Sequence, residues 1–217
     1  MSLKASDSSN GSTFKPVPTG THLARCYRIV DLGTQETVYM GQKKNQHKVM
    51  FSFEVHSEDD QGNKTVTDKG EPMSISKNYT MSLHEKSGLR KDLQSWRGKE
   101  FTAEELRGFD LEKVLGVWCT LNIIRTTGND GKEYTNIAGI SPVSPLQKKV
   151  GLPEGFNEPK LFSIENPDMA LFDTFSTYLK EKIAKSPEWQ ARNEGYVSGT
   201  SGEFADSVDD EDDIPFN

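Results

Sequence analysis

The segment that most restricts the fold is one amphipathic helix pattern in the middle of the chain. Large apolar residues recur there at i, i+4 and i+7, on one helical face: Leu89, Leu93 and Trp96. Ser82 and Glu85 form an S-x-x-E capping box before this stripe, and Gly98 supplies a C-terminal cap. The surrounding segments have the two-residue period of strands, so the chain is expected to place one substantial helix among strands.

Five segments are predicted as strands, three before the helix and two after it. They span residues 21–32, 48–56, 73–81, 114–125 and 133–143. The second alternates most clearly, with apolar Val49, Phe51, Phe53 and Val55 on one face. The polar stretch 35–47 is expected to be a loop, and GNDG at 128–131 predicts a hairpin turn between the last two strands.

This order of elements is that of an OB-fold barrel, in which a helix lies between strands 3 and 4. The predicted fold is therefore mainly β: a five-stranded OB-fold barrel, a C-terminal helical extension and a disordered acidic tail, although other small barrels also have five strands. The expected boundaries are 1–13 for a disordered N-terminus, 14–143 for the barrel, 144–195 for a linker and helical extension, and 196–217 for the tail. A helix from Asn166 carries an apolar stripe that either covers the barrel or forms a dimer contact.

Charge is distributed unevenly along the chain. The net charge is -7, yet residues 196–217 hold seven acids and no Lys or Arg, which leaves 26 acids and 26 bases in residues 1–195. Residues 1–150 alone carry 21 bases and 18 acids. This asymmetry indicates a domain that binds polyanions, followed by an interaction tail.

Sequence signals for catalysis are missing. The four histidines have no Cys or carboxylate at ligand spacing, and no phosphate-binding glycine loop, nucleophile elbow or H-E-x-x-H motif occurs. Cys26 and Cys119 lie within apolar runs typical of buried thiols in a reducing compartment. An enzyme, a metal and a cofactor are therefore not expected. With no apolar run near about 20 residues and no apolar signal segment, a cytoplasmic location is expected.

Basic and aromatic residues alternate along the predicted strands and loops. The candidate DNA-binding residues are Arg25, Tyr27, Tyr39, Lys43, Lys44, His47, Lys48, Lys77, Tyr79, Trp118, Lys132 and Tyr134. Single-stranded nucleic acid is bound by this combination, because cations follow the phosphates while aromatic rings stack on bases. Tyr39 and Tyr79 are the preferred stacking residues. Tyr27 can equally be a core residue, and Trp118 can instead pack beneath the helix.

The end of the chain joins an acidic run to a short apolar tip. The candidate partner-binding residues are Asp209, Asp210, Glu211, Asp212, Asp213, Ile214, Pro215 and Phe216. An apolar tip of this kind can fill a pocket on a partner while the acids meet a basic rim. The acids are also expected to compete with DNA for the basic domain of the same chain.

The acidic run and its D-D-I-P-F tip, together with an OB-like order of elements, resemble the single-stranded DNA-binding proteins of bacteria and their phages. The segments GTHLARCYRIVDLGTQ and KNYTMSLHEKSGLRKDLQSWRGKEF are similar to the phage-encoded OB-fold members. The resemblance implies sequence-independent binding of single-stranded DNA in phage replication and recombination, with a tail that recruits replication or recombination proteins. One departure is that Asn217 follows Phe216, whereas the family ends on the phenylalanine.

Two other functions remain open. A protein-interaction adaptor would use the acidic tail on a barrel that serves only as a scaffold, and a single-strand annealing protein would share the DNA-binding chemistry. A DNA mimic is disfavoured, because a mimic is expected to be acidic throughout and residues 1–150 are net positive.

Overall fold

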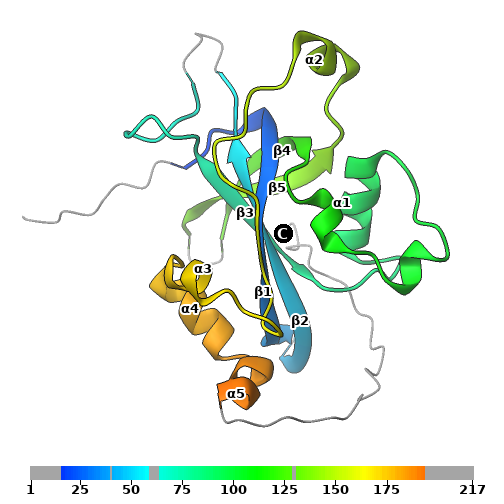
Figure 1. Cartoon of the computed structure of the whole chain (residues 1–217), viewed down its shortest axis with the longest axis vertical. Coiled ribbons are helices and arrows are strands. Elements are labelled where there is room, and N and C mark those ends of the chain that lie inside the picture. The colour runs from blue at the N-terminus through cyan, green and yellow to red at the C-terminus, as the bar shows by residue number, and fades with distance from the viewer. Residues whose placement is uncertain (1–15, 40, 59–63, 129–130, 194–217) are drawn as a thin grey trace, which may run out of the picture.

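The computed structural model describes residues 16–39, 41–58, 64–128 and 131–193, and this part of the chain is mainly β (Figure 1). Its strands are β1 (Gly20–Tyr39), β2 (Gln42–Val55), β3 (Ser74–Thr80), β4 (Trp118–Thr127), β5 (Glu133–Ser141) and β6 (Lys160–Phe162). Its helices are α1 (Gly88–Arg97), α2 (Pro145–Val150), α3 (Met169–Asp173), α4 (Thr177–Ala184) and α5 (Pro187–Asn193), with 3-10 turns at Glu105–Arg107 and Leu111–Val114.

The strands form one six-stranded sheet in the order β3-β2-β1-β4-β5, with β6 attached to β1. All ladders are antiparallel except that of β6, which runs parallel to β1 from Arg28↔Lys160 to Val30↔Phe162. The strand order leaves β3 and β5 as the two edges, and no ladder joins them in the described part of the chain. The mainly β prediction is confirmed, whereas the predicted five-stranded barrel is not.

The first two strands are longer than the sequence pattern predicts. The polar stretch expected to be a loop instead pairs as a two-stranded hairpin, from Thr34↔His47 to Tyr39↔Gln42. Gly33 does not end β1: its φ of 65° coincides with an irregularity in the ladder between Asp31 and Gly33, where the strand bends and continues. We call residues 34–39 and 42–47 the β1–β2 arm.

The central helix buries the predicted stripe of Leu89, Leu93 and Trp96 and ends at Gly98, whose φ is 66°. The helix begins later than predicted, after Ser87. The Ser82 hydroxyl instead accepts a hydrogen bond from the His84 N–H, which forms a turn before the helix. Thr102 and Glu105 form a capping box after this helix, with reciprocal hydrogen bonds of 2.9 and 3.2 Å.

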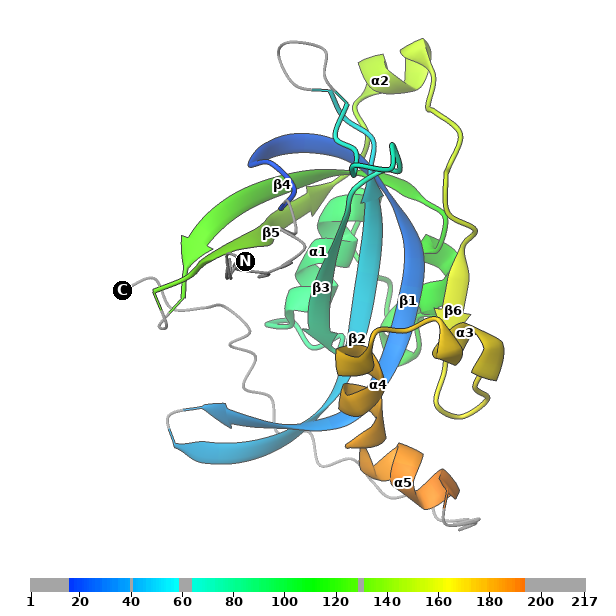
Figure 2. The same cartoon turned by 90° about the vertical axis from the view of Figure 1, so that its left-hand side faces the viewer.

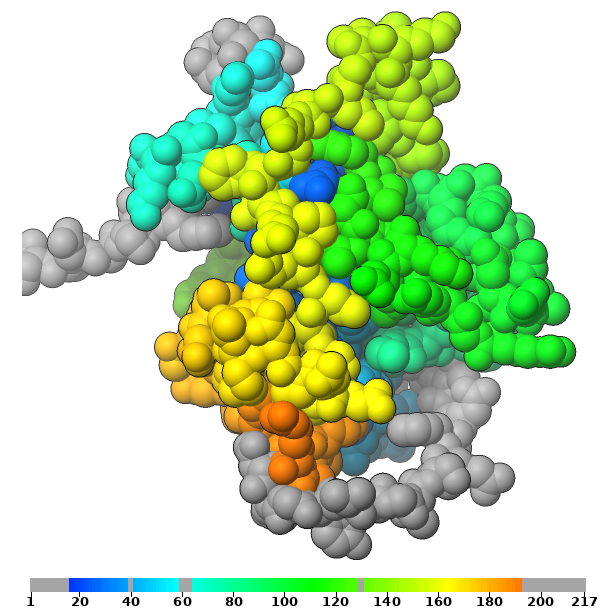
Figure 3. All heavy atoms as spheres, viewed as in Figure 1, coloured from blue at the N-terminus to red at the C-terminus, as the bar shows by residue number. Residues whose placement is uncertain are grey.

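Two apolar cores lie on opposite faces of β1. The first includes Phe51, Phe53, Leu93, Trp96 and Leu121, and α1 packs against it. The second is formed by Val30 and Leu32 of β1 with Phe162, Leu179, Ile183 and Trp189 of the C-terminal extension. Figure 3 shows this extension, in yellow and orange, lying across the blue β1. The helix predicted from Asn166 is divided into α3 and α4, because the Ser176 hydroxyl caps α4 by accepting from the Leu179 N–H.

Candidate nucleic-acid interface

The β1–β2 arm places lysines at an exposed end of the sheet. Lys43 is 69% exposed and pairs at 2.9 Å with Glu36, which is also largely exposed. Lys44 lies opposite Thr37 in the ladder. Tyr39 pairs with Gln42 through its backbone, and its side chain lies outside the described residues. The arm therefore presents cations on a two-stranded ribbon that reaches beyond the cores.

The hairpin of β4 and β5 carries a second set of polar groups. Tyr134 is 47% exposed and lies opposite Thr126 in the ladder. Lys132 is also exposed, and Arg125 makes an exposed ion pair of 3.4 Å with Glu133. Arg125 and Tyr134 point to opposite faces, because their ladder positions differ by one residue. Figure 2 shows this hairpin and the β1–β2 arm projecting to the same side of the molecule, with β2 and β3 between them.

The outward face of β2 and β3 is polar. Ser74, Ser76 and Asn78 are exposed on β3, and the hydroxyls of Ser52 and Ser76 are 2.9 Å apart. On β2 the same face is covered, because Lys48 is only 8% exposed, with its amine donating to the Thr80 hydroxyl at 2.8 Å, and Ser52 is fully buried. Hydroxyl and amide groups of this kind can bind phosphates and sugars without reading sequence.

Lys182 of α4 adds positive charge beside Lys48. Burial lowers the pKa of the Lys182 amine, and the nearby charge of Lys48 lowers it further. Two ammonium groups that repel each other favour an anion between or near them. Nothing in the sequence pattern singles out Lys182, because that pattern does not indicate that α4 packs close to Lys48.

Arg25 has a structural role in this fold. Its guanidinium is 3.3 Å from the Glu54 carboxylate and donates to the carbonyls of Gly116 and Asn157 at 3.1 and 3.0 Å. Glu54 is fully buried, and it also accepts from the N–H groups of Phe156 and Asn157. Burial raises the pKa of Glu54, but the hydrogen bonds from Asn157, His56 and Phe156 outweigh it and leave that pKa below its ordinary value. Arg25 thus holds the extension on the sheet and is not presented to solvent.

Three other candidate residues are also engaged inside the protein. Tyr79, proposed as a stacking platform, is only 2% exposed, and its hydroxyl donates to Asp92 at 2.7 Å. Lys77 is 2.8 Å from the same carboxylate. Trp118 is partly buried with its ring against His56, at a centroid distance of 4.9 Å. The face of β3 that carries Lys77 and Tyr79 packs on α1 and the first core. The prediction that Tyr79 stacks on a base is therefore wrong.

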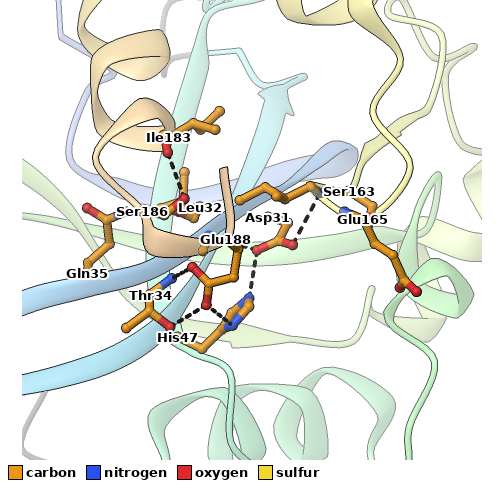
Figure 4. Close-up of polar contacts among 12 residues, drawn as sticks. Asp31, Leu32, Thr34, Gln35, His47, Ser163, Glu165, Ile183, Ser186 and Glu188 are labelled. Atoms are coloured by element: carbon orange, nitrogen blue, oxygen red, sulfur yellow. Dashed lines mark hydrogen bonds and ion pairs between the residues drawn. The ribbon is translucent and has the colours of Figure 1, made fainter. Parts of the chain in front are cut away.

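His47 links the arm to the C-terminal helices (Figure 4). Its Nε2 is 2.7 Å from Asp31 of β1, and its Nδ1 is 3.6 Å from Glu188 of α5. Glu188 also accepts from the N–H and hydroxyl of Thr34, at 2.9 and 2.5 Å. A side chain on Gly33 would bring its Cβ within 2.5 Å of the Ser186 Cβ, so only glycine allows this close approach. We call His47, Asp31 and Glu188 the arm clamp.

The pKa shifts in the arm clamp have two signs. The hydrogen bond to Asp31 and the charges of Asp31 and Glu188 raise the pKa of His47 despite its burial. Burial raises the pKa values of Asp31 and Glu188, but hydrogen bonds from His47 and Thr34, respectively, outweigh this effect and leave both below their ordinary values. All three shifts favour the charged forms, which are protonated His47 and ionised Asp31 and Glu188.

This arrangement predicts that stability depends on pH in two windows. The contribution of His47 is complete below its unfolded pKa of about 6.5 and is lost as pH rises through its higher folded pKa. The contribution of Asp31 and Glu188 is complete above their unfolded values near 4 and is lost as pH falls through their lower folded values. Denaturant unfolding across this range should show that His47→Gln removes the decline on the alkaline side. His84→Gln, outside the arm clamp, should retain it, and an alkaline decline unchanged in His47→Gln would refute the clamp.

The chain matches no family model and no curated protein. In the described part of the chain, no group of three or more His, Cys, Asp or Glu side chains is arranged to hold a metal ion. None of the described helices combines the length and the apolar character needed to cross a membrane. Burial raises the pKa of the Cys26 thiol to about 12, which makes it a poor nucleophile. The candidate partner-binding residues 209–216 lie outside the described residues.

Proposed function

We propose that the protein binds single-stranded DNA without sequence preference and has no catalytic activity. The observation that supports this most is that two hairpins bearing exposed cations project to one side of the sheet (Figure 2). The β1–β2 arm supplies Lys43 and Lys44, and the β4–β5 hairpin supplies Arg125, Lys132 and the exposed ring of Tyr134. A strand that crosses the exposed polar face of β3 would meet cations at both ends.

The order of the elements supports an OB-fold as the scaffold. The sheet order β3-β2-β1-β4-β5, with α1 between β3 and β4 in the chain, is the order of that fold. OB-folds are partly open barrels that bind oligonucleotides on the face of strands 2 and 3 and through the loops after strands 1 and 4. We infer that β3 and β5 are the edges along which such a barrel would close. The two hairpins are then the two binding loops, extended here into ribbons.

The exposed ion pairs on the hairpins suit exchange for phosphate. Lys43–Glu36 and Arg125–Glu133 have both partners well exposed, at side-chain exposures of 48–69%. Ion pairs between exposed side chains stabilise a folded protein by only about 0–1 kcal/mol. A phosphate can therefore replace the carboxylate at little cost, and the counterions that it releases drive binding.

The acidic tail completes the proposed function. Residues 206–213 are a dense run of carboxylates that would compete with DNA for the two hairpins, and residues 214–216 would bind replication or recombination proteins through their apolar side chains. The resemblance of the tip to phage and bacterial single-stranded DNA-binding proteins supports a role in phage DNA replication in a bacterial cytoplasm. An adaptor that uses the tail alone would not need cations on the hairpins.

The proposed function predicts a strong dependence of binding on salt. If Lys43, Lys44, Arg125 and Lys132 each contact a phosphate, log K should fall with log salt at a slope of about -3 on a single strand. Affinity for oligo-dT should then drop about 50-fold between roughly 50 and 200 mM salt. Fluorescence anisotropy with labelled oligo-dT, matched duplex DNA and RNA measures this directly. A chain that lacks residues 206–217 should bind more tightly at low salt, with the difference shrinking as salt screens the tail.

Two results would contradict the proposal. Equal affinity for duplex and single strand would mean that the protein is only a general polyanion binder. Absence of binding by both the full chain and the chain without residues 206–217 would favour the adaptor instead. If the deletion leaves the low-salt affinity unchanged, the tail does not compete with DNA, although the proposal of DNA binding still stands.

A further inference from the structure

A hollow lies on the opposite side of the molecule from the two hairpins. It lies between the outer face of β1 and helix α3, has a volume of about 300 Å³, and is lined by Tyr27, Arg28, Lys160, Ala170 and Leu171 among others. In Figure 2, β6 and α3 are on the right of the molecule, whereas the hairpin tips are on the left. The volume is at the lower end of the range for small-molecule sites. The hollow is thus distinct from the proposed DNA interface.

Arg28 is the unusual group in this hollow. Its guanidinium carbon is 5.4 Å from the ring centroids of both Tyr27 and Phe175, so the two rings hold its position. Its Nε is buried and has no hydrogen-bond partner. Within the described residues, no carbonyl or carboxylate accepts a hydrogen bond from its guanidinium. A guanidinium carries five donors in a fixed fork, and a buried donor without an acceptor destabilises the protein.

The acidic residues around the hollow are already engaged elsewhere. Glu158 is 3.0 Å from Lys160, and the Asp168 side chain accepts from the Leu171 N–H at 3.0 Å to cap α3. Neither carboxylate therefore neutralises Arg28. Lys160, paired with Glu158, places a second cation at the rim beside the guanidinium of Arg28.

We propose that this hollow binds a phosphate monoester, with Arg28 as the bidentate donor and Lys160 as a second cation at its rim. A guanidinium fork matches two phosphate oxygens, and the rings of Tyr27 and Phe175 contact this one. The group has two sources with the same chemistry: a free nucleoside monophosphate, or the terminal phosphate of a nucleic-acid strand. The site does not depend on the proposed function, because the free nucleotide would bind here whatever the hairpins bind.

Isothermal titration calorimetry with the full chain tests the site, with dTMP, inorganic phosphate and thymidine as probes. The two phosphates should bind and thymidine should not. Arg28→Gln should weaken dTMP binding at least about tenfold, and Arg28→Lys should weaken it less, because a lysine keeps the charge but loses the fork. Arg107→Gln, an exposed arginine in the turn Glu105–Arg107, is the matched control and should bind as the parent does.

A second variant covers the case in which Arg28→Gln fails to fold. Ala170 is an exposed position of α3 that lines the hollow, so Ala170→Trp should block dTMP binding while Arg28 stays in place. Tighter binding of 5′-phosphorylated than unphosphorylated oligo-dT, lost in Arg28→Gln, would identify a strand end as the ligand. Equal binding of the two oligonucleotides, with dTMP still bound, would identify the free nucleotide. No binding of any phosphate, or binding unchanged by the Arg28 and Ala170 variants, would overturn the proposal.

Discussion

Neutralising the four cations of the two hairpins should nearly abolish binding of single-stranded DNA. The variant changes to Gln four cations of the β1–β2 arm and the β4–β5 hairpin: Lys43, Lys44, Arg125 and Lys132. Each lost phosphate contact removes one released counterion, so the salt slope of about -3 should fall close to zero. Affinity at roughly 50 mM salt should decrease by on the order of 10² to 10³. Anisotropy titration with oligo-dT at several salt concentrations measures both quantities.

A control with the same change in net charge separates local contacts from overall charge. Exposed cations on and after α1 provide it: Lys91, Lys99, Arg107 and Lys113. Changing these four to Gln should leave the salt slope within error of the parent. If both variants weaken binding equally, DNA is attracted by the electrostatic field of the whole protein, and the hairpins have no special role.

Replacing Tyr79 with Ala should destabilise the protein by about 3–5 kcal/mol. The ring is buried with its edge against Phe51, at a centroid distance of 5.3 Å, and its hydroxyl shares Asp92 with Lys77. Since small proteins are stable by only about 5–15 kcal/mol, much of the margin would be lost. Burial, reinforced by the charge of Asp92, raises the pKa of Tyr79 well above its usual range, so the hydroxyl remains a donor at ordinary pH. Urea unfolding followed by circular dichroism measures the loss.

Tyr134→Ala is the complementary variant. Tyr134 is half exposed on the β4–β5 hairpin, so its loss should change stability by about 0.5 kcal/mol or less while weakening DNA binding by about 1–3 kcal/mol. Tyr79→Phe should retain the packing and lose only the hydrogen bond to Asp92. A Tyr79→Ala protein as stable as the parent would mean that this ring is not a core residue in solution.

The elements that the sequence predicts best are those whose pattern is local. The stripe of Leu89, Leu93 and Trp96 and the alternation from Val49 to Val55 are both visible within one element, and both are buried as expected. The length of β1, in contrast, could not be predicted from a local pattern. Residues 34–39 are polar and read as a loop, but they pair residue by residue with β2, and a ribbon of two polar strands leaves no apolar alternation in the sequence.

Prediction of the site residues was limited by contacts between distant segments. Arg25 looks like a surface cation until residues 154–157 fold over it, and Lys182 looks incidental until α4 packs beside β2. Tyr79 shares the two-residue period of Lys77, but the sequence does not say which face of β3 meets α1. Arg125 could have been found from sequence, since it is the charged residue that ends the apolar run of the fourth strand.

The parallel pairing of β6 with β1 also sets an order of events during synthesis. The edge of β1 at Arg28, Ile29 and Val30 receives its partner only from residues 160–162, roughly 130 residues later in the chain. At synthesis rates of about 5–20 residues per second, that edge waits on the order of ten seconds for its partner. During this interval Val30 and Leu32 also lack the side chains that bury them. The nascent chain therefore passes through a stage with an open apolar edge, at which a chaperone or a neighbouring nascent chain could pair with β1.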